Sequence, residues 1–418
     1  MQFWKQTKIE TVHAREVLDS RGNPTVEAIV RLENGIVGCA KAPSGASTGA
    51  YEAVELRDGD SKRYGGKGVL TAVDNVRREI APAMRGMGLC QRCIDETMCQ
   101  LDGSENKSRL GANGILAVSL AAAKAGAAWQ GVPLYRYVGG IQANRLPIPM
   151  LNILNGGAHA ANNIDVQEFM ILPSGFGTFR ERLRAGVEIY HVLGRKLRGM
   201  GKNTGVGDEG GFAPDMRDAE EALTAIVDAI NEAGYTTEQV QIGLDVAASE
   251  WAGAEVGQYT FPKAGGKVDA VELVNWYSRL CERFPIVSIE DGLGEDDHTG
   301  WKAMTERLGG RAILVGDDYF VTNTNRLQAG IRQGCGNGIL IKPNQIGTLT
   351  ETMEVVALAK AHGYTVILSH RSGETGDTTI ADLAVGLGTG YIKTGAPCRG
   401  ERTEKYNRLL AIEEGRNG

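Results

Sequence analysis

The chain has 418 residues, of which 42% are hydrophobic and 23% are charged, and its formal net charge is −6 at pH 7. This length predicts two domains rather than one, and the acidic balance argues against a surface built to bind nucleic acid. No apolar stretch reaches the ~20 residues of a membrane span, and residues 1–8 lack the apolar core of a signal peptide. We therefore expect a cytoplasmic protein that does not bind membranes.

The first 140 residues predict a small α+β domain. Three apolar, alternating runs separated by turn signals predict a three-stranded meander: 9–18, 25–32 and 36–42. A loop of small residues follows at 43–49, and helical spacing predicts helices over 69–84 and 111–130. Gly139-Gly140 closes this region. We place the domains at 1–140 and 141–418.

The seven cysteines are an odd number in a long chain, which is typical of reduced cytosolic thiols rather than of a disulfide framework. Cys90, Cys93 and Cys99 form a C-x-x-C pair with one further thiol. A zinc site needs a fourth ligand, and no histidine lies nearby. We interpret these thiols as structural or incidental.

The second region repeats one unit. Two strand candidates, 150–154 and 167–172, are followed by helical patterns over 179–200 and 218–233. Six more apolar runs then occur, most of them spaced by roughly 23 to 28 residues, which is close to the strand–helix repeat of a β/α barrel. Each run ends in polar residues suited to chemistry: Asp245, Glu290, Asp317, Lys342, His370 with Arg371, and Lys393.

The C-terminal ends of barrel strands meet at one mouth, so these polar side chains converge. Acidic residues often end strands simply as solvated groups, but Asp245, Glu290 and Asp317 follow three neighbouring strands. Together they predict a site for Mg²⁺, which prefers oxygen ligands. Lys342 is either a surface lysine or a general base, whose pKa burial and neighbouring cations would lower.

Two further groups suit an anionic substrate. The turn S-H-R-S-G-E-T offers Arg371 and Ser372 to a phosphate, which arginine binds with two parallel hydrogen bonds. Glu168 lies inside an apolar strand, where an unpaired carboxylate is costly. With Asp208 and Glu209 of a glycine-rich loop, it can supply a general acid and its proton network.

One competing pattern is G-x-S-x-G at 45–49, which fits the nucleophile turn of serine hydrolases, with His370 as the base. That turn must open a buried helix, and T-G-A-Y-E-A is a poor helix start. No P-loop, G-x-G-x-x-G or H-E-x-x-H motif is present.

Ordered motifs along nearly the whole chain resemble the enolase family. They are AREVLDSRGNPTVE, PSGASTG, LDGSENKS, LGANGILAVSLA, NILNGGAHAANNIDVQEFMI, GDEGGFAP, LDVAASE, SIEDGL, VGDD, IKPNQIGTLTET, SHRSGET and IKTGAP. The resemblance implies an N-terminal α+β domain and a β/α barrel with one early antiparallel strand. It also implies the Mg²⁺-dependent, reversible dehydration of 2-phosphoglycerate to phosphoenolpyruvate.

The resemblance further implies a role for each matching residue. Lys342 is the base that takes the C2 proton, and Glu209, supported by Glu168, is the acid that helps hydroxide leave C3. The implied binding residues are Asp245, Glu290 and Asp317 for the first Mg²⁺, Ser47 for a second Mg²⁺ with the phosphate, Arg371 and Ser372 for the phosphate, and Lys393 and His159 for substrate.

The same resemblance bears on assembly and specificity. Arg15, Glu413 and Glu414 are present, which implies a homodimer or a higher homo-oligomer built from dimers. Family members are cytoplasmic, some with an additional cell-surface or secreted pool, and are also found in binding roles. Ala158 stands where relatives often carry a larger or hydroxylated residue. The alternative is a diverged paralogue that acts on a related phosphorylated acid, because pocket residues can change specificity.

Overall fold

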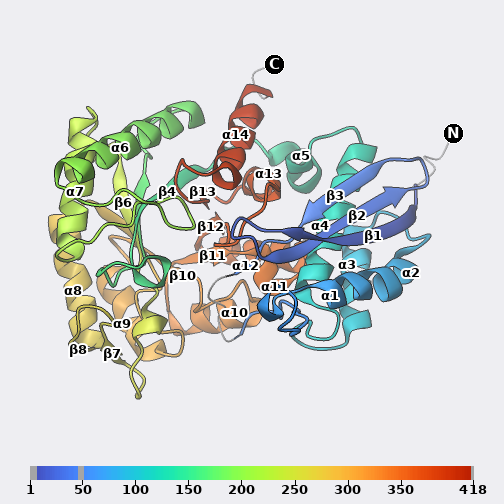
Figure 1. The fold of residues 1–418 in the computed structure, drawn as a ribbon, viewed down its shortest axis with the longest axis horizontal. Coiled ribbons are helices and arrows are strands. Elements are labelled where there is room, and N and C mark those ends of the chain that lie inside the picture. The colour runs from blue at the N-terminus through green and yellow to red at the C-terminus, as the bar shows by residue number, and fades with distance from the viewer. Residues whose placement is uncertain (1–6, 46–50, 416–418) are drawn as a thin grey trace.

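The computed structural model describes residues 7–45 and 51–415, and the fold class expected from the sequence is confirmed (Figure 1). The N-terminal sheet is an antiparallel meander of three strands: β1 Ile9–Leu18, β2 Pro24–Leu32 and β3 Val37–Lys41. Its helical elements are η1 Tyr64–Gly66, α1 Leu70–Asn75, η2 Val76–Ile80, α2 Ala81–Met84, α3 Gln91–Asp102, α4 Ala112–Trp129, α5 Leu134–Gly139 and η3 Gly140–Gln142. The predicted helix over 69–84 is present, interrupted by one π-helical turn.

The second part of the chain is a closed barrel of eight strands. They are β4 Ile148–Asn155, β5 Glu168–Leu172, β6 Gln241–Asp245, β9 Ile286–Glu290, β10 Ile313–Gly316, β11 Gly338–Ile341, β12 Thr365–Ser369 and β13 Tyr391–Lys393. β5 runs antiparallel to both of its neighbours, whereas all other barrel pairs are parallel. The early antiparallel strand is therefore confirmed.

Helices surround the barrel, and two short 3-10 turns and a small hairpin lie at its loops (Figure 1). The helices are α6 Phe179–Gly199, α7 Ala219–Glu232, α8 Ala270–Arg283, α9 His298–Leu308, α10 Thr324–Gln333, α11 Pro343–Ile346, α12 Leu349–Ala361, α13 Thr379–Gly386 and α14 Gly400–Gly415. The loop elements are η4 Gly157–His159, η5 Ala248–Trp251, β7 Gln258–Thr260 and β8 Lys267–Asp269. Large apolar side chains fill the barrel interior: Met150, Met170, Leu172, Val315, Leu340 and Ile367.

Helix α4 is the apolar centre of the N-terminal domain. It packs against β2 and β3 on one side and contacts α11 and α12 of the barrel on another. Within the described ranges, no single helix has the length and apolarity of a membrane span. α4 and the segment Leu134–Gln142 reach that composition only together, and they bend by 94° at the break between them.

The N-terminal domain is tied to the barrel beside the loop that follows β12. The backbones of Ser44 and Gly373 exchange two hydrogen bonds of 2.8 and 2.9 Å. The carboxylate of Asp377 accepts hydrogen bonds from the Lys41 amide (3.1 Å) and from the Lys124 ammonium (2.8 Å). The small-residue loop at 43–49 thus starts beside the predicted phosphate turn.

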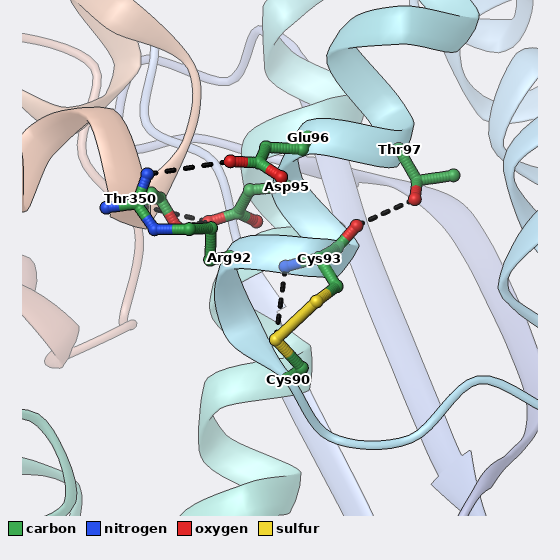
Figure 2. The surroundings of a disulfide bond; sticks show 7 residues. All are labelled: Cys90, Arg92, Cys93, Asp95, Glu96, Thr97 and Thr350. Atoms are coloured by element: carbon green, nitrogen blue, oxygen red, sulfur yellow. Dashed lines mark hydrogen bonds and ion pairs between the residues drawn. A yellow bond between two sulfur atoms is a disulfide. The ribbon is translucent and has the colours of Figure 1, made fainter.

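The structure joins Cys90 and Cys93 in a disulfide (Figure 2). The prediction of reduced thiols is therefore wrong for this pair. Cys90 is the N-cap of α3 and Cys93 lies in its first turn, which places their Cα atoms 5.3 Å apart, within the range that a disulfide spans. The other cysteines are free thiols: Cys39, Cys99, Cys281, Cys335 and Cys398.

Close packing of the sheet on α4 gives a test of this domain. A Cβ added at Gly38 would lie 2.1 Å from the Ala121 carbonyl oxygen, which is backbone and cannot rotate away. We expect Gly38→Ala to lower the free energy of unfolding by about 1–3 kcal/mol, measured by urea titration. Gly177 has no atom within 4 Å of such a Cβ, so Gly177→Ala is the control. Equal unfolding midpoints for the two variants would contradict the close packing of Gly38 against α4.

Candidate active site

The strand ends bring the predicted polar residues together at one mouth of the barrel. Asp245 and Glu290 end β6 and β9 and are paired in register. Glu168 pairs with Asp245 because it is the first residue of the antiparallel strand β5, so the start of that strand reaches the same rim. Lys393, at the end of β13, pairs with Ser369 at the end of β12.

A single cavity at this mouth collects most of the predicted site. Its lining includes His159, Glu168, Glu209, Asp245, Asp317, Lys342, Arg371, Ser372 and Lys393. Glu290 is fully buried and is not part of the cavity lining, but it accepts a hydrogen bond from Lys393, which is. Ser47 falls outside the described residues. Residues that are far apart in the sequence therefore share one polar pocket.

Lys393 is the cation at the centre of the buried carboxylates. Its Nζ donates to Asp245 Oδ2 at 2.8 Å and to both oxygens of Glu290 at 2.9 Å, and it lies 3.3 Å from Glu168 Oε2. Burial opposes the charge, but Asp245 and Glu168 outweigh it and raise the pKa of Lys393 well above its ordinary value. The ammonium is therefore held protonated.

Lys342 pairs with a different carboxylate. Its Nζ contacts Asp317 Oδ2, and the other oxygen of Asp317 accepts from Gln345 Nε2 at 2.9 Å. Burial favours the neutral amine, yet the charge of Asp317 outweighs it and raises the pKa of Lys342. The sequence-based prediction of a lowered pKa is therefore wrong for this arrangement, because the nearest charge is an anion and not a cation.

Glu168 and Glu209 form a coupled acid pair with His159, and the ligand atoms of the three lie within 4.8 Å of one another. Burial and the charge of Glu209 raise the pKa of Glu168 well above its ordinary value. Burial alone would do the same at Glu209, but the imidazoles of His370 and His159 outweigh it and lower the pKa of Glu209. Of the two carboxylates, Glu168 is therefore the one that binds a proton more readily.

His370 lies next to Glu209, and Arg402 orients His370. His370 Nδ1 lies 2.6 Å from Arg402 Nη1, which can only donate, so the imidazole proton sits on Nε2, 3.5 Å from Glu209 Oε2. Burial lowers the pKa of His370 to about 4. The imidazole is neutral at pH 7, so it faces Glu209 with an N–H dipole.

The guanidinium of Arg371 already binds a carboxylate. Its Nη1 donates to Glu52 Oε2 at 2.8 Å and its Nη2 to Glu52 Oε1 at 3.3 Å, and both side chains are buried. Gln345 donates to Glu52 as well, at 3.2 Å. Glu52 therefore occupies the position on Arg371 that an anionic substrate would use.

Ser372 lies at the opposite side of the same turn. Its hydroxyl donates to Glu209 Oε1 at 3.3 Å, so in this arrangement it contacts the acid pair rather than the anion-binding face of Arg371.

The loop that carries His159 is fixed by a lysine. Lys263 Nζ donates to the carbonyl oxygens of Gly157 (2.7 Å) and Ala160 (2.9 Å) and to Asn162 Oδ1 (3.2 Å). Lys263 follows the strand β7, so the small hairpin holds the loop in place. We infer that this contact restricts where His159 can reach.

The donors at the mouth fit a hard divalent cation, because they are carboxylate oxygens and outnumber the cationic side chains around them. Among residues 7–45 and 51–415, two groups of acidic or histidine side chains have ligand atoms within 4.8 Å of one another: Asp291, Asp317 and Asp318, and His159, Glu168 and Glu209. Of the predicted trio, only Asp317 belongs to one of these groups. Asp245 and Glu290 converge on Lys393 Nζ instead.

Several residues at the site were not predicted from the sequence. Glu52 lies just beyond PSGASTG, and Gln345 lies inside the motif IKPNQIGTLTET, so their positions were an available signal. Asp291 follows Glu290 and accepts hydrogen bonds from the amides of Asp317 (2.9 Å) and Asp318 (2.8 Å). Arg402 comes from α14, where nothing in the local pattern marks it.

The arrangement defines a class of protein: an acid–base enzyme built on a β/α barrel, whose buried carboxylates suit a divalent cation and whose arginine suits an anionic substrate. The comparison with known families then identifies the family. The model described as "Enolase, N-terminal domain" matches residues 9–138, and the model described as "Enolase, C-terminal TIM barrel domain" matches residues 143–417. The chain belongs to the enolase family, whose members are metal-dependent lyases.

The buried imidazole predicts a pH dependence of stability. The folded pKa of His370 is about 4, against 6.5 as its ordinary value, so between these pH values the unfolded chain binds a proton that the folded chain does not. Stability from this group is full above pH 6.5 and falls by about 3 kcal/mol as the pH drops to 4. His370→Gln, which keeps a donor and an acceptor, should show a shallower loss in urea titrations at pH 7, 6 and 5. Parallel losses would contradict the assignment.

Proposed function

We propose that the protein catalyses the reversible dehydration of 2-phosphoglycerate to phosphoenolpyruvate with Mg²⁺, as a phosphopyruvate hydratase. One observation carries the proposal: a single cavity places two lysines and an arginine beside a pair of glutamates, Glu168 and Glu209, and the pKa of Glu168 is raised. Removing a proton from C2 and hydroxide from C3 needs a base and an acid on the same substrate, together with cations for its carboxylate and phosphate.

Arg371 and Ser372 bind the phosphate in this proposal. Arginine binds phosphate with parallel hydrogen bonds, and Glu52 must leave Arg371 when substrate arrives. Ser47, from the small-residue loop at 43–49, is a further phosphate contact in this proposal. Lys393 and His159, which both line the cavity, contact the rest of the substrate.

Lys342 removes the C2 proton. It must be neutral to do so, and the neighbouring charges of Arg371 and Lys393 act in that direction, since both lower its pKa against the effect of Asp317. The Glu168–Glu209 pair then supplies the proton with which the C3 hydroxyl leaves as water, with Glu209 as the donor and Glu168 as its proton reserve.

Two Mg²⁺ ions complete the proposal, with Asp245, Glu290 and Asp317 as ligands of the first and Ser47 as a ligand of the second. When bound, the metal supplies positive charge against the negative charge that the substrate carboxylate gains as the C2 proton leaves. Lys393 and Lys342 are the present counterions of these carboxylates, so they are free to turn toward substrate when a cation takes over that role.

We also propose a cytoplasmic location and a homodimer. In the single chain, Glu413 accepts from the amides of Phe179 (2.7 Å) and Arg180 (3.0 Å) at the start of α6, and Glu414 pairs with Arg180. Arg15 pairs with Glu27 and is 58% exposed, so it can still contact a second copy.

A second candidate is a diverged member that acts on a larger phosphorylated acid. A neighbouring cavity of about 190 Å³ shares Gln167 with the first and is lined by Ala158 and Trp251. It lies on the side of Glu168 and His159, where the C3 substituent would sit. The small side chain of Ala158 leaves room there for an added alkyl group.

The first experiment measures phosphoenolpyruvate by ultraviolet absorbance from 2-phosphoglycerate, with Mg²⁺ and again with excess EDTA. We expect turnover with Mg²⁺ that chelation abolishes and added Mg²⁺ restores. A folded, Mg²⁺-binding protein without turnover on 2-phosphoglycerate would contradict the proposal. Turnover only on an analogue with a methyl group on C3 would favour the second candidate.

Replacing the proposed base gives a second test. Lys342→Ala should lower kcat by about 10²–10⁴-fold, the usual contribution of a positioned base, while Mg²⁺ binding measured by calorimetry persists. Lys302, an exposed lysine on α9, provides the matched control, and Lys302→Ala should keep full activity. Near-normal turnover in Lys342→Ala would reject Lys342 as the base.

A further inference from the structure

The disulfide between Cys90 and Cys93 lies at the start of α3 (Figure 2), and neither residue lines the cavity at the barrel mouth. Both residues are exposed at the start of α3, in the sequence C-Q-R-C. The function proposed above uses neither residue. Unlike a structural disulfide that joins distant parts of a chain, this bond closes one helical turn, so it contributes little to holding the fold together.

The start of α3 favours a thiolate on Cys90. Cys90 is the N-cap residue, and its Sγ accepts a hydrogen bond of 3.4 Å from the backbone amide of Cys93. Exposed N–H groups and the positive end of the helix dipole stabilise an anion at this position. Cysteines in this setting, including the first cysteine of C-x-x-C motifs, have thiols that ionise more readily than an ordinary cysteine.

Contacts other than the disulfide anchor the turn that carries the two sulfurs. Gln91 donates to the carboxylate of Asp95 (3.1 and 3.2 Å) and to the Ser119 carbonyl oxygen on α4 (3.1 Å). Asp95 in turn accepts from the amide and hydroxyl of Thr350 on α12, at 2.9 and 2.6 Å.

Arg92 adds an ion pair from the same turn. Its Nη1 lies 2.7 Å from Glu354 on α12 and 3.5 Å from Glu96 on the next turn of α3, as Figure 2 shows for Glu96. Both partners are anions, so the guanidinium charge is largely neutralised. The charged side chains around the disulfide thus anchor the helix start, while the amide groups of α3 remain to stabilise sulfur.

Four of the five free thiols are poorly placed for the same chemistry. Cys281 and Cys335 are buried. Cys39 is exposed, but burial of its sulfur and the neighbouring Glu27 raise its pKa. Burial and the charge of Glu351 raise the pKa of Cys99 to about 11. The fifth, Cys398, is partly buried. We therefore expect reactivity toward thiols and disulfides to be highest at the exposed Cys90–Cys93 pair.

We propose that Cys90 and Cys93 form a thiol–disulfide exchange site whose reaction partners are small thiols and dithiols. An incoming thiolate bonds to Cys93 Sγ, the bond between the two cysteine sulfurs breaks, and its electron pair leaves on Cys90 Sγ. Attack at Cys93 is favoured because the better-stabilised thiolate leaves faster. The second thiolate of a dithiol then attacks the mixed disulfide and releases Cys93. The dithiol loses two electrons and two protons, and the protein gains two thiols.

The direct test equilibrates the folded, full-length chain in buffers of reduced and oxidised dithiothreitol. Acid quenching and alkylation, read by peptide mass, then give the state of each cysteine. We expect the Cys90–Cys93 pair to interconvert reversibly with a single midpoint, while the other cysteines stay alkylated throughout and the circular dichroism spectrum stays unchanged. A pair that stays oxidised in excess dithiol, or one that stays reduced in excess oxidised dithiothreitol, would overturn the proposal.

Two variants that each lack one cysteine of the pair test which sulfur is the more reactive. Cys93→Ala keeps the backbone amide that faces Cys90, so its Cys90 should react with iodoacetamide at pH 7 about tenfold or more faster than Cys39 of the same molecule. As the pH is raised, the alkylation rate of Cys90 should reach its plateau at a lower pH than the alkylation rate of Cys39. Cys90→Ala is the matched variant, in which Cys93 should show no such acceleration. Equal rates for Cys90 and Cys39 would overturn the assignment of Cys90 as the leaving and attacking sulfur.

Discussion

The balance of buried charge at the barrel mouth is the constraint on which the rest of the site depends. Carboxylates from neighbouring strands lie too close together to remain ionised unless cations accompany them. Lys393 takes that role for Asp245, Glu290 and Glu168, and Lys342 takes it for Asp317. A divalent cation would supply the same compensation and leave the lysines available for substrate.

The same constraint divides the proton-carrying groups into two roles. The pKa of Glu168 is raised because burial and the charge of Glu209 act in the same direction. The pKa of Glu209 is lowered because His370 and His159 outweigh the effect of burial. Two chemically identical side chains thus differ in their affinity for a proton through their surroundings alone.

The N-terminal domain completes the site instead of only covering it. Glu52 reaches Arg371 from the segment just beyond the small-residue loop, and the backbone of Ser44 pairs with Gly373 two residues past Arg371. Arg371 is therefore held by a side chain of the N-terminal domain. The interface between the domains also includes α3 and α12, so the Cys90–Cys93 disulfide lies on a helix of the N-terminal domain that contacts the barrel.

The sequence by itself determined the strand–helix repeat, the meander of the first domain and the residue types at the strand ends, because periodic burial and turn chemistry are local properties. The ordered motifs added the enolase family and the antiparallel strand. Periodicity did not reveal the direction of that strand, since an apolar run such as 167–172 has the same pattern in either direction. Only the barrel order shows that Glu168 reaches the mouth from a strand start.

The tertiary structure alone decided which charges pair. Lys342 is held by Asp317, Glu52 occupies Arg371, and Arg402 orients His370 from the last helix, contacts between residues that are 25 to 319 positions apart. The pKa of Lys342 is raised where its sequence context predicted a lowered value. Electrostatic energy depends on distance and burial in three dimensions, and neither is encoded in the local order of residues.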